Sequence, residues 1–179
     1  MEKNKNLWWI MAAMMAALVC AATMVVRIPS PVNGYINLGD GAVLLAAWLL
    51  GPLGGAAAGG LGSMLADVFS DYLHYAPGTL VIKAASAAVA AGIGYLLRRR
   101  GVRSDFVVWT AGGIVGELVM VGGYFLYASL LLGKGWAAAA SLPGNLVQGG
   151  AGVIVSVLLM TAVRKTGRIP VWGTKTEKE

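Results

Sequence analysis

Charged residues are scarce in this chain. Asp, Glu, Lys and Arg make up 12% of the 179 residues, and hydrophobic residues make up 58%. A soluble domain is nearer to a quarter charged. Apolar stretches of about 18 residues or more recur along the chain, and each is long enough to cross a bilayer core of about 30 Å. The composition therefore excludes an ordinary soluble domain and indicates a helical protein of the lipid bilayer.

Cysteine and histidine are almost absent, and catalytic motifs are missing. Cys20 is the single cysteine and His74 the single histidine, so we expect neither an internal disulfide nor a metal site of the usual ligand spacing. The sequence has no G-x-S-x-G, no H-E-x-x-H and no G-x-x-x-x-G-K-[ST] motif. We expect no enzyme activity, no cofactor and no metal. The net charge of +6 does not indicate nucleic acid, because the basic residues gather at the ends of apolar stretches.

Six apolar segments predict an all-α membrane protein with six transmembrane helices in one bundle, formed by residues 1–179 as a single membrane domain. With six spans both termini share one side, and that side holds most of the Lys and Arg residues, including Arg98, Arg99 and Arg100. The positive-inside rule places this side, with the polar tail 164–179, in the cytoplasm. We expect a multi-pass protein of the cytoplasmic membrane. The segments cover residues of about 7–26, 41–50, 53–72, 79–97, 106–132 and 143–163.

Ionisable side chains inside these spans fall in the outer half of the membrane or at its middle. Asp67 and Asp71 lie four residues apart, on one face of a helix that travels outward. Lys83 enters the next span at a similar depth, ~8–10 Å below the outer turn. We predict an ion pair between Asp71 and Lys83, which serves either to tie the two helices together or to present donors to a ligand.

The later spans carry further polar candidates. Glu117 lies near the middle of the fifth span, and Tyr124 and Tyr127 follow on about the same face, so they predict an acidic floor with aromatic walls. Tyr127 is also explained as an anchor at the membrane interface. Asn145 and Gln148 lie one turn apart near the outer start of the last span. Their amides suit the edge of a heteroaromatic ring, or equally a hydrogen bond between helices.

The loop before the second span offers two more candidates. Asp40 at the start of that span is a ligand candidate and also a good helix N-cap, which is its favoured role. Tyr35 belongs to a segment, 35–39, that we expect to cover the site as a lid. The inner halves of the spans are nearly free of strong polar groups, so no continuous polar path crosses the membrane, as a channel would need.

Several segments together resemble the substrate-binding (S) components of energy-coupling factor (ECF) vitamin transporters. The segments are the alanine-rich first span, YINLGD, LLGPLGG, LADVFSDY, TLVIK, GELVMVGGYFLY and PGNLVQG. The resemblance covers about Ala12 to Thr161. It is closest to the riboflavin-type branch, which is similar to sequences assigned to hydroxymethylpyrimidine and pyridoxine as well.

The resemblance implies a six-helix subunit that binds a vitamin from outside and docks on a transmembrane coupling subunit, which two cytoplasmic ATPases drive. Ala12, Ala16 and Ala17 match the small-residue docking pattern of the first helix in such proteins. We expect Lys83, Glu117, Asn145 and Gln148 to contact polar groups of the vitamin, and the tyrosines to stack on its ring. Two alternatives remain open: a stand-alone small-molecule permease or channel, and a membrane transferase that uses Asp67 and Asp71 through Mg²⁺.

Overall fold

Long helices make up almost the whole of the computed structural model, which describes residues 2–30, 34–167 and 172. Five of these helices are long and apolar enough to cross a membrane. The predicted all-helical character is therefore confirmed, whereas the described residues form five long helices where the sequence predicts six spans. The helices are α1 (Glu2–Val25), α2 (Gly39–Phe69), α3 (Ala76–Arg99), α4 (Asp105–Leu126) and α5 (Leu142–Thr166), with a π-helical turn η1 (Tyr127–Leu131) and a 3-10 helix η2 (Gly135–Ser141) between the last two.

Helix α2 folds back on itself at Gly51, whose backbone (φ 75°, ψ −173°) is not helical. A Cβ built on Gly55 would lie 2.6 Å from the Cα of Ala47. Residues eight apart in a continuous helix would be about 12 Å apart, so the two arms must pack side by side. Pro52 opens the second arm, where the missing N–H of proline costs no hydrogen bond. The two arms cover residues 39–50 and 52–69.

The first arm of α2 is the centre of the bundle. Val43, Leu44 and Ala46 are completely buried, and Trp48 is 4% exposed. Helix α1 is peripheral by comparison, since only 22% of its apolar window is buried against 72% for α2. The central arm carries no strong polar group below Asp40, so it forms an apolar plug under the end of the bundle where it begins.

Small residues bring the helices close together, as is common where helices associate in lipid. A Cβ on Gly60 would lie 2.8 Å from the carbonyl oxygen of Leu80, at the contact of α2 with α3. A Cβ on Gly116 would lie 2.8 Å from the carbonyl oxygen of Ser86, at the contact of α3 with α4. Larger side chains at these glycines would force the backbones apart.

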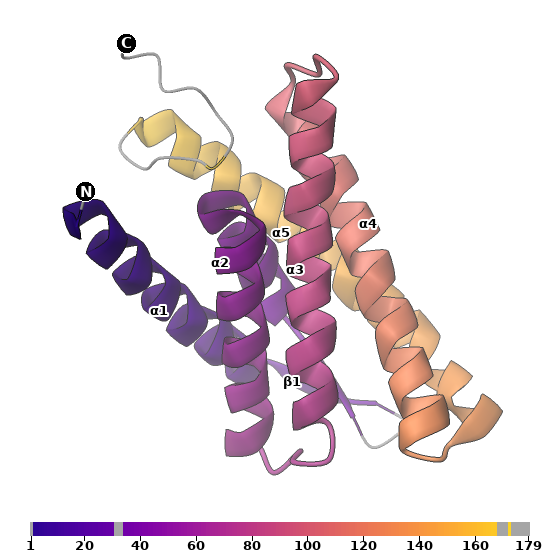
Figure 1. Ribbon diagram of the computed structural model, residues 1–179. Helices are drawn as coiled ribbons and strands as arrows, with labels where there is room; N and C mark the ends of the chain where they lie inside the picture. The colour runs from indigo at the N-terminus through magenta and orange to yellow at the C-terminus, as the bar shows by residue number, and fades with distance from the viewer. Residues whose placement is uncertain (1, 31–33, 168–171, 173–179) are drawn as a thin grey trace.

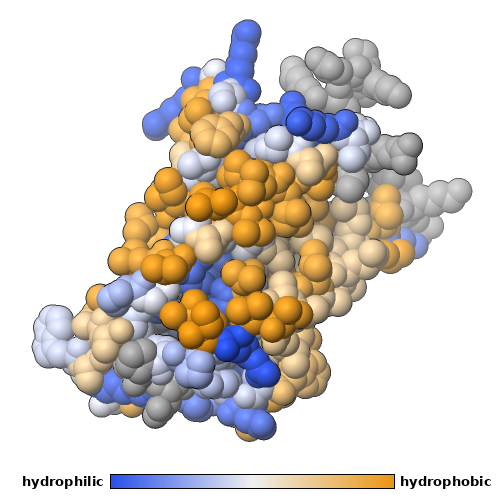
Figure 2. All heavy atoms as spheres, turned by 180° about the vertical axis from the view of Figure 1, so that it is seen from behind, coloured by the Kyte–Doolittle hydropathy of each residue, from blue (hydrophilic) through white to orange (hydrophobic). Residues whose placement is uncertain are grey.

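The two ends of the bundle differ (Figure 1). The start of α1, the α3–α4 turn and the end of α5 lie at one end. The opposite end carries the α2–α3 turn, η2 and a hairpin of two short strands, β1 (Arg27–Pro29) and β2 (Tyr35–Asn37), which pair antiparallel. Figure 2 shows a broad apolar band between hydrophilic ends, as expected for a surface that faces lipid. The two strands were not predicted from the sequence, where the segment before the second span was expected to be a loop.

Candidate functional site

A cavity of about 540 Å³, including the space at its mouth, opens at the end of the bundle that carries the strands. Six of the ten ligand-binding candidates from the sequence line it: Tyr35, Asp67, Lys83, Tyr124, Asn145 and Gln148. The other lining residues are uncharged: Thr23, Ser30, Gly34, Asn37, Ser63, Tyr75, Thr79, Ala128 and Ser141.

Lys83 forms its ion pair with Asp40, and the prediction of a pair with Asp71 is wrong. Both partners are buried, at 2% and 1% exposure. Helix α2 ends at Phe69, and Asp71 follows with a left-handed backbone (φ 63°) that leaves its side chain exposed. Asp71 therefore no longer shares a helix face with Asp67. The paired-carboxylate site that a membrane transferase would need is not assembled here.

Asp40 does not cap α2, contrary to its favoured role from the sequence. The N-cap position is Leu38, and the side-chain oxygen of Asn37 accepts a hydrogen bond from the backbone N–H of Gly39 (2.8 Å). Asp40 lies in the first turn, where the helix dipole favours a negative charge. Its carboxylate accepts from Lys83 and from Gln148 Nε2 (2.6 Å) and is not part of the cavity wall. Asp40 thus holds two wall residues from behind.

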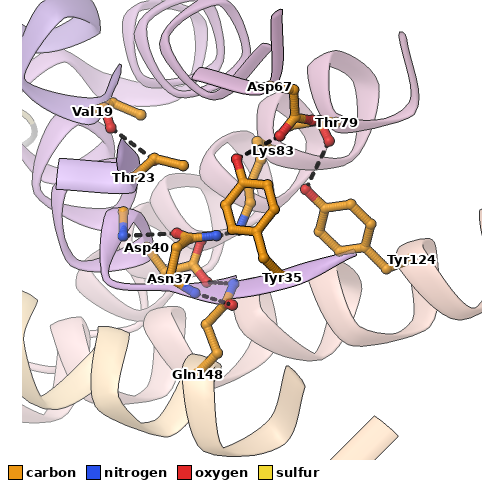
Figure 3. Close-up of polar contacts among 11 residues, drawn as sticks. Val19, Thr23, Tyr35, Asn37, Asp40, Asp67, Thr79, Lys83, Tyr124 and Gln148 are labelled. Carbon is orange, nitrogen blue, oxygen red and sulfur yellow. Dashed lines mark hydrogen bonds and ion pairs between the residues drawn. The ribbon is translucent and has the colours of Figure 1, made fainter. Parts of the chain in front are cut away.

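Gln148 joins three elements through its side-chain amide, as the sticks in Figure 3 show. Its oxygen accepts from the backbone N–H of Asn37 in β2 (2.8 Å), while its nitrogen donates to Asp40 in α2. One side chain of α5 therefore ties the strand hairpin to the bundle. The neighbouring candidate, Asn145, is 9% exposed and lines the cavity one turn nearer the mouth.

Asp67 and Ser63 form the polar wall that α2 contributes. The hydroxyl of Tyr35 in β2 donates to Asp67 Oδ1 (2.6 Å). Burial, with the adjacent Asp67 carboxylate, raises the pKa of Tyr35 well above its ordinary value, so the hydroxyl stays protonated and acts as a donor. Among the described residues, Asp67 Oδ2 and Ser63 Oγ have no hydrogen-bond partner. The wall therefore keeps two polar atoms unsatisfied.

Tyrosines form the adjoining part of the wall. Tyr124 donates to Thr79 Oγ1 (3.0 Å), and the Lys83 ammonium lies 5.5 Å from the centre of the Tyr124 ring. Tyr75, buried and 6.4 Å from the Tyr124 ring, extends this wall toward the mouth. A flat heteroaromatic ligand could stack here. Tyr127 is outside the cavity lining and donates to the backbone oxygen of His74 (2.8 Å), so it joins α4 to the α2–α3 turn.

Glu117 lies behind the cavity wall and does not line it. The residue is 4% exposed, and neither carboxyl oxygen has a hydrogen-bond partner within the described part of the chain. Its Oε2 comes within 3.2 Å of the place that a Cβ on Gly149 would occupy. The structure thus places Glu117 between α4 and α5, and it does not bring this residue to a ligand that occupies the cavity as it stands.

The alanines expected to dock a partner do not share one outward face. Ala12 is 7% exposed and belongs to the apolar core. Ala16 is half-buried and its backbone oxygen contacts α2 at Gly62. Ala17 is exposed, and so are Ala13 and Ala21. Ala12 and Ala16 therefore pack α1 against α2, and the alanines that α1 exposes are Ala13, Ala17 and Ala21.

The sequence analysis missed the uncharged wall residues. Ser63 lies one helical turn before Asp67, and Thr79 one turn before Lys83. Positions four apart share a helix face. A search for hydroxyl residues one turn from each intramembrane charge would have found both. Tyr75 had no such signal, because it lies in the turn before α3.

Comparison with known proteins identifies the family. The family model of the ECF-type riboflavin transporter S component matches residues 5–165. The chain belongs to this family. It is 39% identical, over 138 residues, to a Pyrococcus woesei protein described only as an uncharacterized protein in a gap 3' region; the match covers 76% of this chain and 88% of that protein. It is 29% identical, over 140 residues, to the thiamine precursor transporter HmpT of Lactococcus lactis subsp. cremoris (strain MG1363), covering 78% and 76%.

A solved structure has the same fold. It is described as the S component of a bacterial ECF transporter and superposes with a TM-score of 0.68 at 21% identity, over 92% of this chain and 99% of that one. As an ECF S component, the chain is a substrate-binding subunit of a vitamin transporter. It is a multi-pass membrane protein and not an enzyme.

Proposed function

We propose that this S component captures a small water-soluble vitamin or vitamin precursor from outside the cell, in the cavity beneath the strand hairpin. The candidate class is that of riboflavin, hydroxymethylpyrimidine and pyridoxine. The observation that carries this proposal is the cavity itself, which combines unsatisfied polar atoms on α2 with tyrosine rings in its lining. The name of the Lactococcus relative supports the pyrimidine member of this class.

We further propose a single membrane domain that crosses the bilayer six times, with the two arms of α2 as separate spans. Both termini would lie in the cytoplasm. The basic residues at the end of the bundle opposite the cavity support this orientation: Arg98, Arg99, Arg100, Arg103, Arg164 and Lys165. The cavity then opens to the outside of the cytoplasmic membrane, and the apolar first arm of α2 closes it below.

The strand hairpin would act as the lid. Two hydrogen bonds join β2 to the cavity wall in the described part of the chain: the Tyr35 hydroxyl donates to Asp67, and the Asn37 backbone N–H donates to Gln148. Both partners belong to the cavity wall, so the lid closes directly over the site. The Tyr35 ring also packs against Tyr72 at 4.6 Å between ring centres. Transport would then need a coupling subunit and two cytoplasmic ATPases, with the exposed alanines of α1 as a docking face.

Native mass spectrometry and calorimetric titration test the proposal. The full chain, purified in detergent from cells fed with the three vitamins, should retain one of them, and titration should give one site per chain. Proteoliposomes that contain this chain alone should show no uptake. Uptake by the chain alone would favour the stand-alone permease, and a protein that binds none of the three compounds would refute the proposed substrate class.

A further inference from the structure

Three buried carboxyls lie at the cavity wall or behind it, with a single buried ammonium among them. Asp67 is 3% exposed, Asp40 1% and Glu117 4%, and these three carboxyls surround one buried ammonium, that of Lys83. Lys83 is already paired with Asp40. Of these carboxyls, Asp67 alone lines the cavity. Its Oδ1 accepts the Tyr35 hydroxyl, and its Oδ2 is left without a partner among the described residues.

Ser63 repeats the situation one helical turn away. It is 1% exposed, it lines the same cavity, and its hydroxyl has no partner in the described part of the chain. Buried polar atoms in native proteins are nearly always hydrogen-bonded, and leaving one unsatisfied is costly. Two such atoms, on one helix face and at the wall of a cavity, mark the position of hydrogen-bonding groups that a ligand would supply.

We propose, on the basis of the proposed function, that Ser63 and Asp67 select the ligand by charge and by donor groups. The site takes a neutral or cationic heteroaromatic compound that presents an amino or hydroxyl donor to Asp67 Oδ2 and a second polar group to Ser63. It rejects the phosphate ester of the same compound. A free carboxylate acts only as an acceptor, so it matches an N–H or O–H group, whereas a phosphate brings only acceptor oxygens and further negative charge into a poorly solvated wall.

The cations near the mouth do not reverse this preference. Lys134 Nζ lies 3.2 Å from the Tyr75 hydroxyl, and Arg27 in β1 is exposed. Both are at the rim, where water screens their charge. A phosphate held by Lys134 would itself supply no donor to the two unsatisfied atoms of α2.

Titration of matched pairs tests the inference on the full chain in detergent. The pairs are hydroxymethylpyrimidine, pyridoxine and riboflavin, each against its monophosphate. For the vitamin that the chain binds, we expect the unphosphorylated compound to bind about 100-fold more tightly than its monophosphate. The phosphate would lose its hydration in the site and gain no hydrogen-bond or charge partner there. Asp67→Asn keeps the shape of the side chain and removes its charge. It should lower the affinity for the unphosphorylated compound by about tenfold, and it should reduce the difference in affinity between the compound and its monophosphate. Ser63→Ala should lower the affinity for both compounds of the pair and leave the ratio of their affinities unchanged.

Asp71→Asn is the matched control, because Asp71 is an exposed carboxylate outside the cavity; it should change neither affinity. Thermal unfolding of each ligand-free variant shows that the comparison is made between folded proteins. If both members of a pair bind equally well, or if Asp67→Asn leaves their ratio unchanged, the selection by Asp67 is refuted while the capture of a vitamin stands. If no unphosphorylated compound binds, the proposed function fails, and this inference fails with it.

Discussion

Replacing Lys83 by methionine is a direct test of how this membrane bundle is held together. Lys83 is 2% exposed and its ammonium is paired with Asp40, which is 1% exposed. Methionine has a similar length, fills the same space and cannot compensate a carboxylate. The variant therefore leaves Asp40 buried with one remaining side-chain donor, Gln148 Nε2 at 2.6 Å. We expect a large loss of stability, because the perturbation creates an uncompensated charge and does more than remove a contact.

The magnitude separates two explanations. A neutral hydrogen bond between membrane helices is worth about 0.6 kcal/mol on average. Removing one partner of a buried ion pair costs about 3–5 kcal/mol. If Lys83 and Asp40 act as a charge pair, Lys83→Met should lose about 3–5 kcal/mol, and Lys83→Met combined with Asp40→Asn should recover much of it, since the second change removes the stranded charge.

Reversible unfolding in mixed micelles measures these free energies. Arg164→Met is the matched control: Arg164 pairs with Asp105 at the other end of the bundle but is 48% exposed, and an exposed pair contributes about 0–1 kcal/mol. The reasoning is refuted if Lys83→Met costs no more than this control, or if the double variant is no more stable than Lys83→Met. Ligand titration on the same variants tells whether the network also positions the cavity wall.

Three further predictions follow from positions outside this network. Glu117→Gln should leave vitamin affinity unchanged and stability equal or higher, because Glu117 is buried without a hydrogen-bond partner among the described residues; a tenfold loss in titration would return it to the site. Gly51→Ala should lower the free energy of unfolding by about 1–3 kcal/mol, because the backbone φ there is 75°. Gly122→Ala should leave the free energy of unfolding unchanged, because a Cβ at Gly122 would contact no other atom. Ala17→Trp should abolish uptake by the complete transporter and keep binding, whereas Ala12→Trp, in the core, should unfold the protein; normal uptake with Ala17→Trp would discard the docking face.

Depth along the membrane could be predicted from the sequence, because a helix rises by a fixed 1.5 Å per residue. Counting from the outer turns was enough to bring Asp67, Lys83 and Gln148 to one end of the bundle, and all three line the cavity. Glu117 was counted to the middle of its span. Counting residues does not give the rotation of a helix about its own axis. Glu117 therefore has the predicted depth, but its side chain packs between α4 and α5 and does not line the cavity.

Partners across the bundle could not be predicted for a different physical reason. The pairing of Asp71 with Lys83 assumed that the helix continues past Asp71, but the chain leaves the helix at Ser70 and Asp71 turns outward. The true partner, Asp40, is 43 residues before Lys83 and approaches it because α2 doubles back at Gly51. A local sequence pattern contains no information on such a contact, which depends on how helices pack side by side.

The same fold-back places the proposed floor and the proposed lid next to each other in the chain. The first arm of α2 begins at the cavity with Asp40 and continues as an almost completely buried apolar segment, so the carboxylate that holds Lys83 and Gln148 is anchored in the core. The strand hairpin directly precedes that arm and is joined to it through the Asn37 bond to Gly39. A lid so placed can release Tyr35 from Asp67 and still remain fastened to the floor. If the proposed site and lid are right, binding and closure are coupled at Asp67, because one of its oxygens accepts the Tyr35 hydroxyl and the other is left for the ligand.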